Sequence, residues 1–499
     1  MLPVVLLLFA VSSSPPSDNP ARLYKIAWTD RLPWSRVVNL ADIQGDSLAA
    51  RLQTAQQQLR KQGGGVVYFP AGDYTFEDDI FLEDGVILRG ATPTGVTDAR
   101  QEGYAPPTRF FFPRYRPTFT GAGTPNHTAF KGIRLRDPGT ASRCGVVHLD
   151  LHRGHIHLGD DGSSEHRAGS QRLVLGCVLR NAAVADPAVP DRRIEQHAWQ
   201  RFTHRHHAAI TVKGADLLIA GNRLPKSGEE NFTMKDYIVR AGKTKVSLPE
   251  VVFDYDNRPG LYINDYGLGG SGASLPDGTP QSHPWGFRKG IVIRDNYLYH
   301  TGRCAIAFAG DGVICSGNVI RFAREIYRPT ATGRDRTTGA STNDNRAIQM
   351  RGWRWVVENN DYEVYRNLAA DRKYYINDGE GLMHEDHVNS TIRDSVLRNN
   401  RGNTYLSLYK TGGIDGLLIE GNDIRDGIFV VADRNKSRHL CRKVRIINNT
   451  THGGAITIAG MPAEDNEVRG NRSVGKPARL DNRAAARLQD NENFTLSAK

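Results

Sequence analysis

LRNN (397–400), IEGN (419–422), IINN (446–449) and VRGN (468–471) repeat one pattern, in which an asparagine closes a short apolar segment. Successive asparagines are 22, 27 and 22 residues apart (422 − 400, 449 − 422 and 471 − 449). A repeat of this length without helical periodicity is typical of the coils of a β-solenoid. Because one coil cannot bury its own apolar face, each coil must stack on the next.

Each coil divides into three short strands. In one coil these are YLSLYK (405–410), LLIEGN (417–422) and DIRDG (423–427). The repeated asparagine falls at the turn between the second and third strands, where Asn tolerates a left-handed backbone. We expect these side chains to stack from coil to coil and to hydrogen-bond one another. The same pattern extends back through Asn360, Asn318, Asn296 and Asn222, so the solenoid spans most of the chain.

The segment before the first coils also has a recognisable pattern. Residues 46–61 place Leu48, Leu52, Ala55 and Leu59 on one helical face, and glycines follow at 63–65. The next stretch is GGGVVYFPAGDYTFEDDIFLEDGVILRG (63–90). This combination resembles the N-terminal segment of the pectate-lyase-like superfamily of right-handed parallel β-helix proteins. The resemblance implies an all-β, right-handed, single-stranded parallel β-helix with an N-terminal amphipathic capping helix. The main alternative, an open sheet flanked by helices, is disfavoured by the shortage of amphipathic stretches.

The predicted domain organisation follows from these boundaries. Residues 1–17 are expected to be a signal peptide, which implies a secreted, extracellular or periplasmic protein; the alternative is a buried apolar N-terminal strand. Residues 18–63 form the N-terminal segment and capping helix, and 64–473 the β-helix. Insertions are expected at 223–289, 323–346 and 361–379, and a polar tail at 474–499.

Composition limits the partners of the chain. With 65 Lys and Arg against 54 Asp and Glu, the formal net charge is +11, which favours an anionic partner. No nucleic-acid-binding signature and no further membrane-spanning stretch occurs, and we expect a monomer that binds an acidic polysaccharide. The five cysteines lack the spacing of a zinc site. Cys304 and Cys315 could form a bridge in an oxidising compartment; the alternative is small buried core residues.

The superfamily includes polysaccharide lyases, glycoside hydrolases, epimerases and phage tailspikes, so the resemblance leaves the reaction open. The polygalacturonase pattern of paired Asp with Gly-His-Gly and Arg-Ile-Lys is absent, as is the Asp-Pro-His motif of mannuronan epimerases. GDDG (159–162) has two adjacent carboxylates but not their companions, and is interpreted as a turn.

Strand alternation separates buried from outward residues on the first strand of each coil. Ile348 and Met350, for example, are expected inside, with Gln349 and Arg351 facing solvent. This outward column is polar in the middle coils and apolar toward the C-terminus. A groove of cationic and acid–base side chains suits β-elimination on a uronate polymer, in which a cation offsets the carboxylate and a base takes the C5 proton.

The predicted site residues fall into two groups. The candidate catalytic residues are Lys213, Arg351, Tyr409, Lys410 and Glu385, with Lys213 or Arg351 offsetting the carboxylate and Tyr409 or Lys410 acting as base or acid. The candidate substrate-binding residues are Gln349, Arg303, Arg346, Glu380 and His157.

Alternatives remain for several of these residues. Hydrolysis would use two carboxylates from Glu380, Glu385 and Asp386, and a non-catalytic module would bind glycan on the same face. Adjacent carboxylates at 385 and 386 make calcium a candidate cofactor. HRHH (204–207) is interpreted as a solvated loop rather than a metal site. His384 has an inward register and is predicted to be a core histidine.

Overall fold

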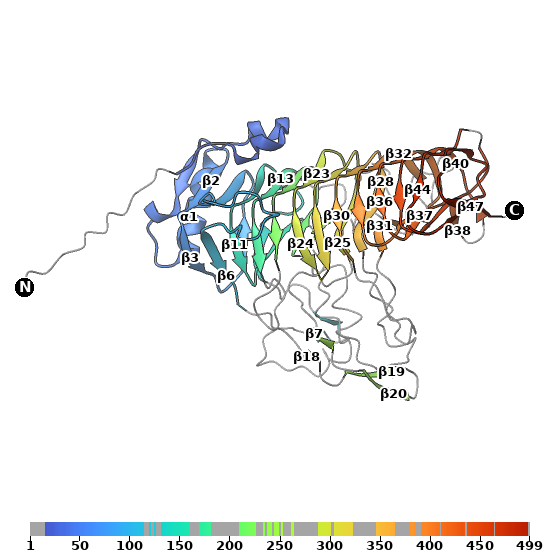
Figure 1. The fold of residues 1–499 in the computed structure, drawn as a ribbon. Coiled ribbons are helices and arrows are strands. Elements are labelled where there is room, and N and C mark those ends of the chain that lie inside the picture. Colours follow the sequence, from blue (N-terminus) through green and yellow to red (C-terminus); the bar gives the residue numbers. More distant parts are fainter. Residues whose placement is uncertain are drawn as a thin grey trace, which may run out of the picture.

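The computed structural model describes residues 15–113, 119–120, 124–125, 131–159, 169–180, 209–225, 233–234, 237–241, 244–248, 251–252, 261–263, 288–300, 304–322, 346–364, 380–385, 391–409, 411–434, 437–463 and 465–497. Three long sheets, in which every strand pair is parallel, run the length of the molecule (Figure 1). The chain passes from sheet A to sheet B to sheet C in each coil and then returns to sheet A. The protein is therefore a right-handed, single-stranded parallel β-helix, as predicted.

Sheet A contains the strand that precedes the repeated asparagine. Its strands, in spatial order, are β1 (Val37–Asn39), β2 (Gly65–Phe69), β5 (Val86–Gly90), β10 (Cys144–Val147), β13 (Ser170–Leu175), β16 (Ala215–Ala220), β23 (Ile291–Arg294), β26 (Ile314–Ser316), β29 (Val356–Glu358), β32 (Thr391–Arg398), β35 (Gly413–Glu420), β40 (Cys441–Ile447), β43 (Glu467–Arg469) and β46 (Arg487–Gln489).

Sheet B contains the strand that follows that asparagine. Its strands are β3 (Gly72–Thr75), β6 (Thr108–Phe111), β11 (Asp150–His152), β14 (Val178–Arg180), β17 (Arg223–Leu224), β24 (Tyr297–His300), β27 (Val319–Phe322), β30 (Asp361–Tyr362), β33 (Arg401–Gly402), β36 (Asp423–Ile424), β41 (Thr450–Thr451) and β44 (Arg472–Ser473).

Sheet C completes each coil. Its strands are β4 (Ile80–Leu82), β9 (Gly132–Leu135), β12 (His155–Leu158), β15 (Ile210–Val212), β22 (Leu261–Ile263), β25 (Cys304–Asp311), β28 (Arg346–Trp353), β31 (Glu380–Glu385), β34 (Leu406–Tyr409), β37 (Gly427–Val431), β42 (Ala455–Ala459), β45 (Ala478–Asn482) and β47 (Phe494–Leu496).

Four two-stranded antiparallel sheets are separate from these three. They pair β7 (Phe119–Thr120) with β8 (Thr124–Pro125), β18 (Thr233–Met234) with β21 (Val251–Val252), β19 (Tyr237–Ala241) with β20 (Thr244–Leu248), and β38 (Asp433–Arg434) with β39 (Ser437–Arg438).

One apolar core fills the space between the three sheets. Inward residues stack in register from strand to strand, as Leu406, Ile428 and Ile456 do on sheet C. All three are fully buried, and the cluster to which they belong extends from Leu40 to Ala486. Each coil therefore buries its apolar residues against the coils on either side.

The N-terminal end of this core is covered by a helix, as predicted. Helix α1 spans Leu48–Lys61 and is capped by the Ser47 hydroxyl, which accepts the Ala50 N–H at 3.1 Å. Leu52, Ala55 and Leu59 are buried in the core cluster. Figure 1 shows α1 at the N-terminal end of the stack, where the first coil would otherwise expose its apolar face.

The segment before α1 lies against the outer face of sheet A. It contains the short 3-10 helices η1 (Pro20–Tyr24), η2 (Ala27–Arg31) and η3 (Leu40–Asp42). Trp28 and Trp34 pack in a second apolar cluster with outward residues of sheet A such as Ile87 and Leu173. The outward residues of sheet A are apolar in the first coils, where the segment before α1 covers them.

The repeated asparagines form the stacked series expected from the sequence. The side-chain nitrogen of each donates to the side-chain oxygen of the next at 2.9–3.0 Å, in the order Asn222, Asn296, Asn318, Asn360, Asn400, Asn422, Asn449, Asn471 and Asn491. We call this series the asparagine ladder. It fixes the turn between sheets A and B in the same place in successive coils.

Several boundaries differ from the sequence prediction. Residues 474–499 are not an irregular tail, because β45, β46 and β47 continue the sheets as far as Leu496. At the other end, β1 pairs with β2, so sheet A begins before residue 64. Within the expected insertion 223–289, β17 and β22 occupy regular places in sheets B and C. Residues 361–362 likewise form β30 rather than the start of an insertion. The signal-peptide prediction falls mostly on residues 1–14, which lie outside the described residues.

Four of the five cysteines belong to the apolar core, and the fifth, Cys304, is buried beside Gln349. All five are free and buried, so the bridge considered between Cys304 and Cys315 is not formed. Burial raises the pKa of Cys144, Cys177 and Cys441 to about 12. The interpretation of these cysteines as small buried core residues is confirmed.

Candidate functional site

The outward face of sheet C contains most of the residues predicted to form the site. Ile348, Met350 and their register partners Leu382 and His384 point into the core. The alternation that places them inside places Gln349 on the outer side. The predicted register is therefore confirmed, including the inward position of His384, whose side chain is fully buried.

Three candidate catalytic residues occupy one position on consecutive strands. Arg351 follows Met350 on β28, and the partner of Met350 on β31 is His384. Glu385 follows His384 and is the register partner of Tyr409 on β34. Since adjacent strands are about 4.8 Å apart, Arg351 and Tyr409 are separated by roughly 10 Å along the face. One or two sugar units would fit between them.

Lys213 and His157 lie farther along the same face. Lys213 follows β15, and β22 and β25 separate that strand from β28. Three strand spacings, about 14 Å, therefore separate Lys213 from Arg351. The carbonyl of Lys213 accepts a hydrogen bond from Arg172 at 2.5 Å. His157 is on β12, one strand before Lys213. The strand register thus aligns the backbone positions of Arg351, Glu385 and Tyr409 on three consecutive strands, and it places Lys213 three strands away.

The outward residues of β28 are buried, which differs from the expectation that they face solvent. Gln349 has no exposed surface, and Arg346 and Arg351 are 2% and 6% exposed. Gln349 accepts a hydrogen bond from the Cys304 thiol at 3.3 Å. Strand alternation identifies the side of the sheet that a residue takes, but not whether other groups pack against that side. Two buried arginines on one strand, outside the apolar core, still mark this position as unusual.

Other predicted residues cannot be placed as side chains. Arg303, Lys410, Asp386, most of GDDG (159–162) and HRHH (204–207) lie outside the described residues. For Glu380 and Glu385 the structure gives the backbone register only, with Glu380 opposite Arg346. No group of three or more His, Cys, Asp or Glu that could hold a metal occurs in the described part of the chain.

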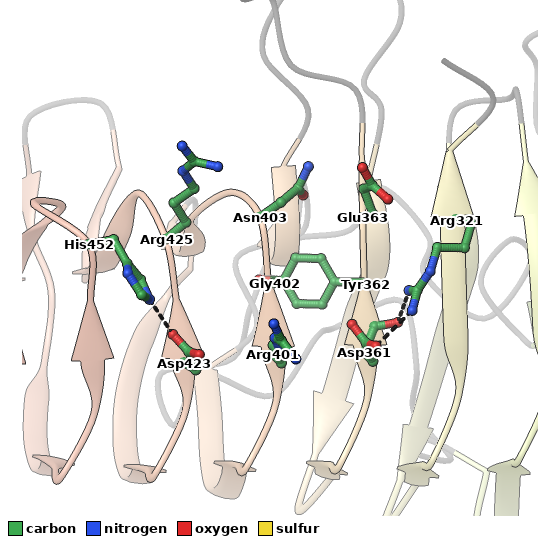
Figure 2. Close-up of a pocket in the computed structure, with 10 residues that line it drawn as sticks. All are labelled: Arg321, Asp361, Tyr362, Glu363, Arg401, Gly402, Asn403, Asp423, Arg425 and His452. Carbon is green, nitrogen blue, oxygen red and sulfur yellow. Dashed lines mark hydrogen bonds and ion pairs between the residues drawn. The ribbon is translucent and has the colours of Figure 1, made fainter. Parts of the chain in front are cut away.

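A second site, absent from the sequence prediction, lies on the outward face of sheet B. It is a surface pocket of about 530 Å³, which we call the sheet B groove (Figure 2). The residues that line it are Arg321, Asp361, Tyr362, Glu363, Arg401, Gly402, Asn403, Asp423, Arg425 and His452. They come from β27, β30, β33, β36 and β41 and from the residues directly after these strands.

Each of the two aspartates of the sheet B groove contacts a basic side chain, and the two contacts lie at opposite ends of the groove. At one end, Arg321 donates to the Asp361 carboxylate at 2.7 Å. At the other, Nε2 of His452 lies 2.6 Å from the Asp423 carboxylate. Between the two carboxylates lies Arg401, the register partner of both Asp361 and Asp423. Figure 2 shows this order along the groove.

Two arginines of the groove are exposed and without a partner among the described residues. Arg401 and Arg425 are both exposed, and neither guanidinium has a hydrogen bond or ion pair there. Asn403, between them and Glu363 in Figure 2, is held by two hydrogen bonds with the backbone of Val364, at 2.9 and 3.0 Å. The groove thus combines fixed carboxylate and amide groups with two available cations.

The sequence contains a signal for this groove at two positions after each ladder asparagine. On sheet B, the residues one and three positions after each ladder asparagine point outward and the residue between them points inward. After Asn360, Asn400 and Asn422 these pairs are Asp and Glu, Arg and Asn, and Asp and Arg. The residue types at these two positions therefore indicate a polar outward face on sheet B.

Comparisons with known proteins found similar solved structures but no family. No family model and no curated protein matches the chain. Among solved structures, the A-module of Azotobacter vinelandii mannuronan C-5 epimerase AlgE6 is similar, with 12% identity and a TM-score of 0.38 over 92% of this chain and 99% of that one. A tailspike protein of E. coli bacteriophage HK620 has 12% identity and a TM-score of 0.43, over 94% and 73%. DFA-IIIase from Arthrobacter chlorophenolicus has 13% identity and a TM-score of 0.39, over 87% of each chain. Similarity this low carries no argument about activity.

Proposed function

We propose that the protein is a carbohydrate-active enzyme, a polysaccharide lyase that cleaves an anionic, uronate-containing polysaccharide by β-elimination on the outward face of sheet C. The observation that supports this proposal is the alignment of Arg351, Glu385 and Tyr409 at one position of three consecutive strands. The backbone positions of these three residues follow one another on adjacent strands at intervals of about one sugar unit.

Arg351 and Tyr409 have defined roles in this reaction. The Arg351 guanidinium binds the uronate carboxylate and offsets its charge, so that the C5 proton becomes more acidic. The deprotonated Tyr409 oxygen takes that proton. The electron pair of the C5–H bond forms the C4–C5 double bond, the bond from C4 to the glycosidic oxygen breaks, and the Tyr409 hydroxyl formed in this way gives its proton to the leaving oxygen. The products are one chain that begins with an unsaturated uronate at its non-reducing end and a departing chain with a new reducing end.

The test is incubation with a panel of polyuronates and sulfated glycans, followed by the absorbance of the unsaturated product and by a reducing-sugar assay. We expect both signals on a uronate polymer. Arg351→Ala and Tyr409→Phe should each lower the rate about a hundredfold, whereas Arg472→Ala, on β44, should leave it unchanged. Full activity in the folded Arg351 and Tyr409 variants would reject these roles.

Two alternative functions give different outcomes. Reducing ends without unsaturated product would indicate hydrolysis by carboxylates such as Glu380 and Glu385. Binding without either product would indicate a non-catalytic glycan-binding module.

A further inference from the structure

We propose that the sheet B groove is a separate binding site for the carboxylate groups of an acidic polysaccharide, with Arg401 and Arg425 as its two anion-binding residues. The ligand class rests on the function proposed above. The site itself rests on independent observations: a pocket, two available arginines and fixed polar groups, on a different sheet from the proposed catalytic residues.

The first argument is that arginines of this solenoid pair with carboxylates on adjacent strands. Arg109 and its register partner Asp73 form a two-point pair at 2.6 and 2.9 Å. Arg401 has a carboxylate as register partner on both sides, yet it pairs with neither. Asp361 and Asp423 instead accept from Arg321 and His452, at opposite ends of the groove.

Arg425 has no carboxylate as a neighbour on the adjacent strand of the groove. It follows β36 and continues the ladder of backbone hydrogen bonds, since its N–H donates to the Gly402 carbonyl at 3.1 Å. Directly after Gly402, the residue at the equivalent position is Asn403, whose amide is engaged with Val364. The guanidinium of Arg425 is therefore available to a ligand.

The spacing of the two arginines matches a polymer with repeated carboxylates. Arg401 and Arg425 lie on adjacent strands, about 4.8 Å apart, and are offset by two residues, about 6.6 Å, along the strand direction. Their Cα atoms are thus about 8 Å apart, and their long side chains can converge or diverge. A polyuronate has a carboxylate on every sugar, so neighbouring sugars could each form a two-point contact with one guanidinium.

The carboxylates of the groove give it selectivity for a sugar over a simple anion. Asp361 and Asp423 are acceptor-only groups, and each keeps lone pairs that its single partner does not use. They can accept hydrogen bonds from sugar hydroxyls on either side of Arg401. Because they also repel a small anion, two arginines between fixed carboxylates favour a ligand that combines hydroxyl and carboxylate groups.

The experiment measures binding of saturated oligogalacturonate and oligomannuronate to the full-length protein, with their carboxyl-reduced, neutral forms as controls. Titration calorimetry is carried out on the Arg351→Ala background to limit turnover. We expect Arg401→Gln and Arg425→Gln each to weaken the binding of at least one acidic oligomer about tenfold. Arg472→Gln is the matched control, because it removes the same charge from the same outward column of sheet B, outside the groove, and should change affinity less than twofold.

A second measurement uses the unaltered protein and does not depend on how the variants fold. Phenylglyoxal modifies exposed arginines, and peptide mass mapping identifies the sites. Bound oligomer should protect Arg401 and Arg425 but not Arg472. Equal affinity in the groove variants, equal modification with and without oligomer, or no binding of either acidic oligomer would overturn the proposal.

These outcomes are distinct from a failure of the proposed enzyme. Binding through the groove without any cleavage product would reject the lyase and support the site. Cleavage that proceeds while the groove variants bind as tightly as the unaltered protein would support the lyase and reject the site.

Discussion

The side-chain amide of Asn318 donates to the side-chain oxygen of Asn360 at 2.9 Å, and the same oxygen accepts the backbone N–H of Asn318 at 3.0 Å. Both residues are almost fully buried. One asparagine therefore satisfies two donors of the preceding coil, while its own amide donates to Cys315 and Asn400. The turn between sheets A and B is stabilised by side chains rather than by water.

Asn360→Ala should lower the free energy of unfolding by about 2–4 kcal/mol, because two buried donors of Asn318 lose their acceptor. Chemical denaturation with circular dichroism measures this change. Asn491→Ala provides the comparison, since Asn491 ends the asparagine ladder and is only half-buried. If Asn360→Ala and Asn491→Ala lower the free energy of unfolding by similar amounts, burial of a ladder asparagine contributes little to stability.

Gly402→Ala should destabilise the coil that contains the groove. A Cβ at Gly402 would lie 1.9 Å from the ring of Tyr362, its register partner, so the ring must move. The backbone of Gly402 does not have a positive φ, so the expected cost of the Gly402→Ala change is steric rather than conformational. The Tyr362→Ala change alone should cost about 3–5 kcal/mol through the cavity it leaves.

The double variant separates these causes. Gly402→Ala with Tyr362→Ala should cost less than the sum of the two single changes, because the clash no longer exists. Thermal or chemical unfolding of all four proteins completes the cycle. Additive costs would rule out the ring contact as the reason for glycine at 402.

Acid should destabilise the fold before the ordinary carboxylates titrate. Burial, assisted by Arg89, lowers the pKa of His148 to about 4, and burial also lowers the pKa of His152. The unfolded chain binds these protons below about pH 6.5 and the folded chain does not, so stability falls between pH 6.5 and 4. For His148 the total loss is about 3 kcal/mol.

Denaturation curves at several pH values, compared with those of His148→Asn, test this expectation. The variant should have a shallower decline between pH 6.5 and 4. Asp415 acts in a different window: Arg442 holds the pKa of that carboxyl below its usual value, so its contribution is lost only at more acidic pH. An unchanged slope in the variant would exclude His148 as the cause.

Truncation after Ser473 should expose the C-terminal end of the core. Ile456 and Ile458 are fully buried, and β45 is their neighbour on the C-terminal side. Loss of residues 474–499 should lower the melting temperature and increase binding of a hydrophobic dye. Removal of β47 alone, from residue 494, is the milder control. A truncated protein as stable as the full chain would mean that β45 and β46 do not contribute to the cooperative fold.

The sequence predicted the architecture because a solenoid repeats its determinants. A ladder asparagine and inward apolar residues of sheet C recur in successive coils, and the apolar face of α1 follows the helical period. The last coil was missed because β45 (ARLDN) and β46 (RLQ) are mostly polar, although Asn491 continues the asparagine ladder. Periodicity predicts a strand only where one of its faces is apolar.

The site was less predictable for a different physical reason. Alternation correctly placed Gln349 on the outer side of sheet C, but its full burial depends on groups that pack against that side. The sheet B groove depends on which charges find partners, and the sequence does not show that Arg401 is left between two engaged carboxylates. Pairing and burial are properties of the assembled coils rather than of one strand.

Asn449 and Asn471 lie one coil of 22 residues apart. Loss of one coil from the gene would therefore change which charged residues lie side by side on the surface. Codons 450–471 encode β41, β42 and β43, one strand for each sheet. Their in-frame loss would join Asn449 to Arg472, and Asn449 would then donate to Asn491 in the asparagine ladder. Arg472 would take the place of Thr450 as the register partner of Asp423. His452 would disappear in the same event. A lineage could thus exchange the charge pattern of this face by a single recombination between repeats, with no point mutation in the core.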